Sequence, residues 1–351
     1  MSITNIIAKK ELEKLLKEWG ENYGVFLPTR QGNYTNITRW DGNAVKLEDW
    51  YDNTDNPAKT VILPRYEKLF SYSKEGGKIK LEEESPTNEL QIIFGVRPCD
   101  VMALDLLDNV FIKDEYVDIY YKKRRQNNII VSLGCLKPNE SCFCTSVGGD
   151  PHGSKGSDIL FTDIGESYLL QGITAKGKKL LNGSKTLKAT GIADTNKLKQ
   201  VHREARQSVS RKLDVSGIKE NALAVFEDKE FWQQLASKCV ACGICTLFCP
   251  TCYCFDINDV KNKHNGSRYR NLDSCSFSVY TQMPMENPRS DKWRRVRNKV
   301  CHKYQFYPTL FDRIACSGCG RCIRLCPVNW DITEAVTAVQ TRAAKSQRKV
   351  K

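Results

Sequence analysis

Two stretches of the sequence carry four cysteines each at one spacing, Cys-x2-Cys-x2-Cys-x3-Cys, and a proline follows the last. The first copy is Cys239, Cys242, Cys245 and Cys249, and the second is Cys316, Cys319, Cys322 and Cys326. Thiolates at this spacing bind [4Fe-4S] clusters in bacterial two-cluster ferredoxins. Structural zinc needs only paired Cys-x2-Cys units, so it is the weaker interpretation. Two complete copies therefore predict two [4Fe-4S] clusters.

In such ferredoxins the fourth cysteine of each motif binds the cluster of the other motif. This exchange predicts cluster I on Cys239, Cys242, Cys245 and Cys326, and cluster II on Cys316, Cys319, Cys322 and Cys249. Glycines inside the motifs are expected to let the backbone approach the sulfurs. They are Gly243, Gly318 and Gly320.

Four further cysteines lie at the ends of expected strands in the first half of the chain: Cys99, Cys135, Cys142 and Cys144. Strands that end side by side would bring the four thiols together, which is the number that a third [4Fe-4S] cluster needs. The alternatives are zinc, because the spacing is not that of a ferredoxin, and ordinary buried cysteines. Because the last two lie in a polar loop, where burial gives little reason for them, we favour the third cluster.

The remaining cysteines have no assigned partner set. Cys252, Cys254 and Cys275 are candidate further ligands, either of a fourth cluster or of a catalytic cluster for disulfide or sulfur chemistry. Cys301 is expected to be a small apolar residue. The basic run at 292–299 is expected to form a solvated face, with a docking surface for an acidic partner as the alternative. His302 is expected to be structural.

Short apolar runs bounded by Gly, Pro, Asn and Asp predict strands. They lie at 24–28, 60–64, 90–96, 128–134, 158–164 and 168–173. Helices are predicted at 9–19, at 100–111 with Asp100 as the N-cap, and at 115–126. No glycine-rich phosphate motif follows any of these strands, so no dinucleotide site is expected.

The predicted fold class is α+β: an α/β-like N-terminal domain, a helical segment and a bacterial two-[4Fe-4S] ferredoxin-type domain. The predicted limits are 1–175 for the first domain, 176–237 for the helical connection, 238–335 for the ferredoxin-like domain with its insertion, and 336–351 for a basic tail.

Composition narrows the class of protein. The 351 residues include 16 cysteines but no signal-peptide core and no membrane-spanning run, so we expect a cytoplasmic protein with reduced thiols. The formal charge of +13 suggests a nucleic-acid binder. However, each cluster with four thiolates carries about −2, and two or three clusters would remove about four to six charges. No nucleic-acid module is recognisable, and nucleic-acid binding is not expected.

The ordered motifs resemble one known family across about residues 60–330: FGVRPCDVMALDLLD, CFCTS, CPTCYCFD, DSC, NPR, HKY and CSGCGRCIRLCPV. They are similar to the family that contains an iron–sulfur subunit of anaerobic sulfite reductase and the β subunit of sulfhydrogenase, a nickel–iron hydrogenase. The cysteines of the third set match recurrent family positions, as do Cys252, Cys254 and Cys275. Cys301 does not, and Leu272 stands where a tryptophan is common.

The resemblance implies a function. Members of the family are electron-transfer subunits of multisubunit anaerobic oxidoreductases. They relay single electrons between a flavin-containing subunit that reacts with NAD(P)H and a catalytic subunit, which is a sulfite reductase or a nickel–iron hydrogenase. The chain is accordingly expected to have no catalytic residues of its own.

Overall fold

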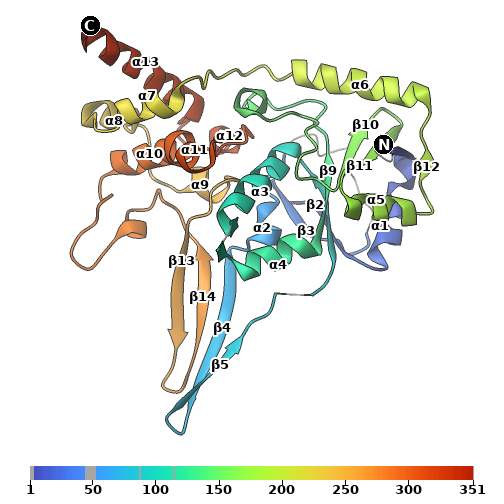
Figure 1. Ribbon diagram of the computed structural model, residues 1–351, viewed down its shortest axis with the longest axis horizontal. Coiled ribbons are helices and arrows are strands. Elements are labelled where there is room, and N and C mark those ends of the chain that lie inside the picture. The colour runs from blue at the N-terminus through green and yellow to red at the C-terminus, as the bar shows by residue number, and fades with distance from the viewer. Residues whose placement is uncertain (1–3, 44–52, 87, 114, 351) are drawn as a thin grey trace. The chain divides into compact units, whose positions relative to one another are not determined.

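The computed structural model describes residues 4–43, 53–86, 88–113 and 115–350. The chain divides into two compact units (Figure 1). The first contains residues 1–62, 88–212 and 317–320, and the second contains residues 63–87, 213–316 and 321–351. The division at 212/213 lies inside the stretch that was expected to be a helical connection. Two segments, 63–87 and 317–320, belong to a different unit from the residues on either side of them.

A mixed eight-stranded sheet forms the centre of the first unit, in the order β12-β1-β11-β10-β9-β6-β2-β3. The middle strands β10, β9, β6 and β2 run parallel, and the pairs at both sides are antiparallel. Every residue of β6, β9 and β10 is buried, as is usual for parallel strands covered on both faces. The strands are β1 (Thr4–Ala8), β2 (Gly24–Gln31), β3 (Tyr34–Arg39), β6 (Gln91–Val96), β9 (Asn128–Leu133), β10 (Ile159–Asp163), β11 (Ser167–Gly172) and β12 (Lys188–Ala189).

Helices and short ladders complete this unit: η1 (Lys9–Glu11), α1 (Leu12–Gly20), α2 (Lys59–Ile62), α3 (Pro98–Phe111), β7 (Ile112–Lys113), β8 (Tyr116–Val117), α4 (Ile119–Asn127), η2 (Cys144–Val147), α5 (Ala175–Gly183) and α6 (Ile192–Gln207). The apolar stripe of α1 is buried against the sheet, as its spacing predicts. Its members are Leu12, Leu15, Leu16 and Trp19.

Three local predictions were wrong. Residues 60–64 were expected to form a strand, but residues 60–62 belong to the short helix α2. Ile62 is buried, and the helix ends before Pro64. Asp100 is not an N-cap, because α3 begins at Pro98, and its carboxylate instead accepts a hydrogen bond from the backbone N–H of Ala58 at 3.1 Å. Finally, α4 begins only after Asp118, whose carboxylate caps it by accepting from the N–H of Tyr121.

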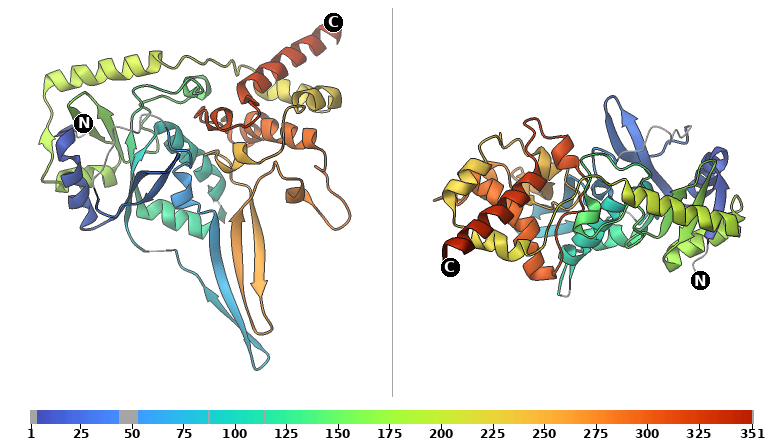
Figure 2. Two further views of the ribbon diagram at one scale, coloured as in Figure 1. Left: turned by 180° about the vertical axis from the view of Figure 1, so that it is seen from behind. Right: turned by 90° about the horizontal axis from the view of Figure 1, so that it is seen from above.

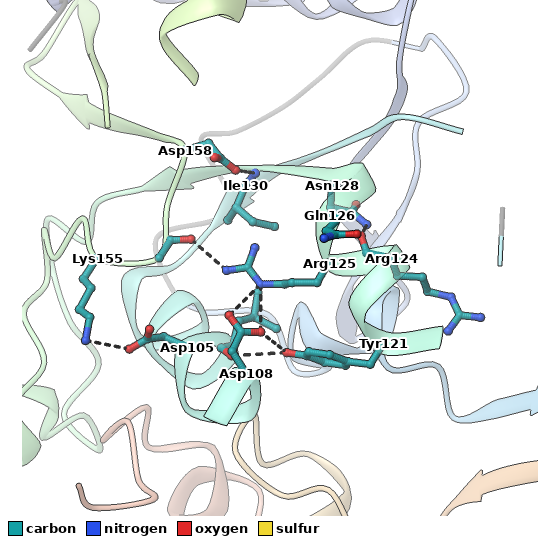
Figure 3. Close-up of polar contacts among 12 residues, drawn as sticks. Asp105, Asp108, Tyr121, Arg124, Arg125, Gln126, Asn128, Ile130, Lys155 and Asp158 are labelled. Atoms are coloured by element: carbon teal, nitrogen blue, oxygen red, sulfur yellow. Dashed lines mark hydrogen bonds and ion pairs between the residues drawn. The ribbon is translucent and has the colours of Figure 1, made fainter. Parts of the chain in front are cut away.

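A buried polar group joins α3 and α4 (Figure 3). The hydroxyl of Tyr121 donates to Asp108 at 2.8 Å, and the guanidinium of Arg125 lies 3.2 Å from the same carboxylate. Arg125 also donates to the carbonyl of Gly156 at 3.4 Å. Burial raises the pKa of Asp108, although Arg125 and Tyr121 partly offset this. These contacts fix α3, whose first turn carries Cys99.

A four-stranded antiparallel sheet belongs to the second unit, in the order β13-β14-β4-β5. Two hairpins lie side by side to form it (Figures 1 and 2). Its strands are β4 (Tyr66–Glu75), β5 (Lys78–Glu83), β13 (Phe255–Lys261) and β14 (Asn265–Leu272). The guanidinium of Arg270 on β14 donates to the carboxylate of Glu67 on β4, and both side chains are buried. This sheet was not predicted from the sequence. Every residue of its strands β5 and β13 is exposed.

The rest of the second unit is helical, and the overall mixture of helices and sheets confirms the predicted α+β class. Helix α13 packs against α7, and α10 packs against α8 (Figure 2). Within the described residues, no helix is long and apolar enough to span a membrane. The elements are α7 (Ile218–Ala224), α8 (Lys229–Leu235), α9 (Ile244–Leu247), η3 (Ser278–Thr281), α10 (Lys292–Cys301), the π-helix η4 (His302–Phe306), α11 (Tyr307–Phe311), α12 (Arg321–Arg324) and α13 (Ile332–Val350).

Candidate metal centres

One cavity of the second unit is lined by the four cysteines that were predicted for cluster I: Cys239, Cys242, Cys245 and Cys326. Three come from the first motif around α9, and the fourth comes from the second motif. A [4Fe-4S] cluster binds each thiolate through a separate iron, so its ligands must surround a space. The cavity has this arrangement, and Cys242 lies at its exposed edge.

The backbone around this cavity directs N–H groups at sulfur. The N–H of Ala241 lies 3.4 Å from Sγ of Cys239, and the N–H of Trp330 lies 3.2 Å from Sγ of Cys326. Such donors stabilise thiolates and the negative charge of a cluster. Gly243 has φ +77°, and a Cβ at this position would lie 2.6 Å from the ring of Phe277, so the tight loop requires glycine.

Three of the four cysteines predicted for cluster II surround two buried side chains of the π-helix η4. The ammonium of Lys303 donates to Sγ of Cys249 at 3.3 Å and lies in the field of Cys316. Burial, together with Cys316 and Cys322, raises the pKa of the Tyr304 hydroxyl. Cys319 belongs to the first unit. Its membership of this ligand set therefore stays a prediction from motif spacing.

A second cavity lies in the first unit and is lined by all four cysteines of the third set: Cys99, Cys135, Cys142 and Cys144. The parallel strands β6 and β9 are neighbours. Cys99 follows β6 and Cys135 follows β9, so both lie where the strands end at one edge of the sheet. Burial, with the thiols of Cys135 and Cys142 close by, raises the pKa of Cys144 to about 12.

Cys319 also lines this second cavity, which sequence reasoning missed. The N–H of Phe143 donates to the carbonyl of Gly318 at 2.9 Å, and the thiol of Cys142 lies 3.6 Å from the carbonyl of Cys319. A Cβ on Gly318 would lie 2.5 Å from Cα of Cys144. The sequence does contain a signal for this contact. Gly318 and Gly320 flank Cys319, and glycine allows another segment to approach the backbone closely.

The remaining cysteines are buried or half-buried in the second unit. Cys252 interacts with Cys249, and this contact, together with burial, raises its pKa. A hydrogen bond with Cys275 lowers the pKa of Cys254 to about 6. Burial raises the pKa of Cys301 to about 12. Across the described ranges, no three Cys, His, Asp or Glu side chains converge as a single metal ion would require.

Comparison with known proteins relates the chain to iron–sulfur proteins. Residues 238–330 match the model of the 4Fe-4S dicluster domain. The chain is also 26% identical over 328 residues to sulfhydrogenase 2 subunit beta of Pyrococcus furiosus, an alignment that covers 93% of this chain and 94% of the relative. No solved structure matches it. The resemblance expected from the motifs is confirmed, because the chain is similar over nearly its whole length to the β subunit of a sulfhydrogenase.

Proposed function

We propose that this chain relays single electrons between two partners, namely a flavin-containing subunit that reacts with NAD(P)H and a catalytic subunit of sulfite reductase or nickel–iron hydrogenase type. The observation that carries the proposal is the cavity of the second unit, in which three cysteines of one motif meet the last cysteine of the other. Bound [4Fe-4S] clusters supply one-electron chemistry there. The exposed position of Cys242 offers an edge at which electrons can enter or leave.

The proposed ligand sets follow the motifs and the cavities. Cluster I takes the cysteines of the first cavity, and cluster II takes Cys316, Cys319, Cys322 and Cys249. The third cluster takes Cys99, Cys135, Cys142 and Cys144, which line the second cavity. The donor chemistry fits for the first two sets, because N–H groups point at the sulfurs of Cys239 and Cys326 and a buried ammonium points at the sulfur of Cys249. The chain's own residues bind the clusters, exclude water and supply compensating charge.

Metal analysis tests the ligand sets. Iron, zinc and acid-labile sulfide are measured per chain in anaerobically purified protein, and about twelve irons are expected for three clusters. Cys144→Ser should remove the third set and leave about eight irons. The matched control Cys301→Ser should leave the count unchanged. A wild-type count of about eight irons would overturn the third cluster, and zinc without iron would overturn the whole proposal.

The relay itself is tested in the native complex. Anaerobic purification should recover a flavin-containing subunit with this chain, and NADH or NADPH should reduce the clusters spectroscopically. Cys326→Ser, which alters cluster I, should slow this reduction, whereas Cys301→Ser should not. Reduction at an unchanged rate in Cys326→Ser would contradict a relay through the first cavity.

A second candidate is a catalytic site at Cys252, Cys254 and Cys275. The close pairing of Cys254 with Cys275, which lowers the pKa of Cys254 to about 6, favours it, because a thiolate is the reactive form in sulfur chemistry. In the native complex, Cys254→Ser and Cys275→Ser should then abolish turnover while twelve irons and cluster reduction remain. An unchanged turnover rate would remove this candidate.

A further inference from the structure

Two lysines of the second unit are buried one helical turn apart. Lys299 lies in α10 and Lys303 in the π-helix η4 that continues it, and each side chain is only 4% exposed. Burying a charged side chain is costly unless opposite charge or hydrogen-bond acceptors surround it. No ion pair with a carboxylate is found for either lysine within the described ranges. Their surroundings must therefore compensate the charge in another way.

Lys303 uses all three of its donors. Its Nζ lies 3.3 Å from Sγ of Cys249, 2.7 Å from Oγ1 of Thr251 and 3.0 Å from the carbonyl of Ala315. A neutral amine has only two N–H groups, so three acceptors around Nζ fit the charged ammonium. Sulfur thus provides the negative charge beside this cation.

Lys299 has a different environment. Its Nζ lies 4.6 Å from the ring centroid of Trp330, and it has no hydrogen-bond partner of good geometry among the described residues. Lys299 lines the first cavity together with Cys239, Cys245 and Cys326, which are predicted ligands of cluster I. Lys299 therefore lies beside ligands of the first set, while Lys303 contacts a ligand of the second set.

We propose that Lys299 and Lys303 act as fixed buried cations that raise the reduction potentials of the clusters, Lys299 that of cluster I and Lys303 that of cluster II. The inference rests on the proposed electron-transfer function. Reduction adds one negative charge to a cluster that already carries about −2. A nearby cation in a water-excluded site stabilises the reduced form more than the oxidised form, so reduction becomes easier.

The experiment is a redox titration of the full-length, anaerobically purified protein, followed by electron paramagnetic resonance. Lys303→Met should make reduction of one cluster at least tenfold less favourable, which is about 59 mV for one electron. Lys299→Met should lower the potential of the other cluster by a similar amount. Lys299→Arg and Lys303→Arg keep the charge and should stay near wild type. Lys263→Met removes an exposed lysine of the same unit, whose charge water and salt screen, and should change neither potential.

The iron content of each variant shows whether a negative result contradicts the proposed function or only the role of the lysines. Protein without iron would overturn the proposed function itself, whereas full iron with unchanged potentials in both methionine variants would overturn only the role of the lysines. If Lys303→Met loses its iron, Lys303→Gln provides a polar neutral replacement, and the same shift is expected of it. If the potentials of the arginine variants shift as far as those of the methionine variants, side-chain shape rather than charge sets the potential. This result would also overturn the inference.

Discussion

The ammonium of Lys303 lies 3.3 Å from the sulfur of Cys249, the last cysteine of the first motif. The same ammonium donates to Thr251 and to the carbonyl of Ala315, so its three N–H groups are all used. The hydroxyl of Thr251 in turn donates to Ala315 at 2.8 Å. This small network joins the π-helix to Thr251, which follows the first motif, and to Ala315, which precedes the second.

Thr251→Val should weaken this network. The substitution keeps the shape of the side chain but removes one acceptor from a buried ammonium, and we expect a loss of about 1–3 kcal/mol of stability. The measurement is anaerobic thermal unfolding of the iron-loaded protein. Thr309→Val is the control, because the Thr309 hydroxyl is exposed and donates to the carbonyl of Gln305 in the preceding helical turn. Equal melting temperatures for the two variants would contradict the prediction.

Gly318→Ala should disrupt the second cavity. Gly318 has φ +62°, and a Cβ would lie 2.5 Å from Cα of Cys144, which is backbone and cannot move aside alone. We expect a lower melting temperature together with loss of about four of the irons. Gly183→Ala is the matched control, since a Cβ there meets nothing within 4 Å and should be neutral or slightly stabilising. Full iron in Gly318→Ala would show that the loop does not need glycine.

Glu67→Gln should destabilise the four-stranded sheet. Glu67 and Arg270 form a buried pair between β4 and β14, and removal of one charge leaves the other unpaired in the interior. The expected cost is about 3–5 kcal/mol, measured by urea unfolding. Asp259→Asn breaks the exposed pair of Asp259 with Arg268 in the same sheet and should leave the midpoint almost unchanged. Similar midpoints for the two variants would count against the buried pair.

His152 should make stability depend on pH. Burial, with His202 and Arg97 nearby, lowers the pKa of His152 to about 3, from about 6.5 in the unfolded chain. The unfolded state therefore binds the proton first as the pH falls, and stability decreases below about pH 6.5. Between pH 7.5 and 5 the loss from this residue is about 2 kcal/mol. His152→Leu should reduce the difference between urea midpoints at these two pH values, and an unchanged difference would contradict the assignment.

The structure brings together around one cavity the cysteines predicted for cluster I, and around another the third set. Motif spacing, a local property of the sequence, pointed to the first group, and the expected strand ends pointed to the second. Cys99 and Cys135 were also placed correctly at one edge of the sheet, since buried apolar runs mark parallel strands such as β6 and β9. The strand expected at 60–64 was wrong, because a short run of β-branched residues fits both a strand and a buried turn of helix.

Other features depend on contacts between distant segments. The pairing of β14 with β4 joins residues about 200 positions apart in the sequence. Apolar residues do alternate with polar ones in β5, at Ile79 and Leu81, but both are exposed, and so short a run among charged residues also fits a solvated loop.

The run at 292–299 was expected to be a solvated face, yet Arg295 and Lys299 are buried. Arg295 donates to the carbonyls of Arg289 and Ser290, and Lys299 lies beside the cysteines of the first cavity. These partners come together only in the folded chain, so the charge run alone does not reveal them.

The cavity of the second unit also has a consequence for biosynthesis. Cys245 and Cys326 line it together, but they lie 81 residues apart in the sequence. At about 5–20 residues per second, a ribosome adds Cys326 roughly 4–16 s after Cys245. During that interval the first three thiols of the cavity exist without the fourth. The nascent chain therefore cannot complete this ligand set until almost the whole protein has been synthesised.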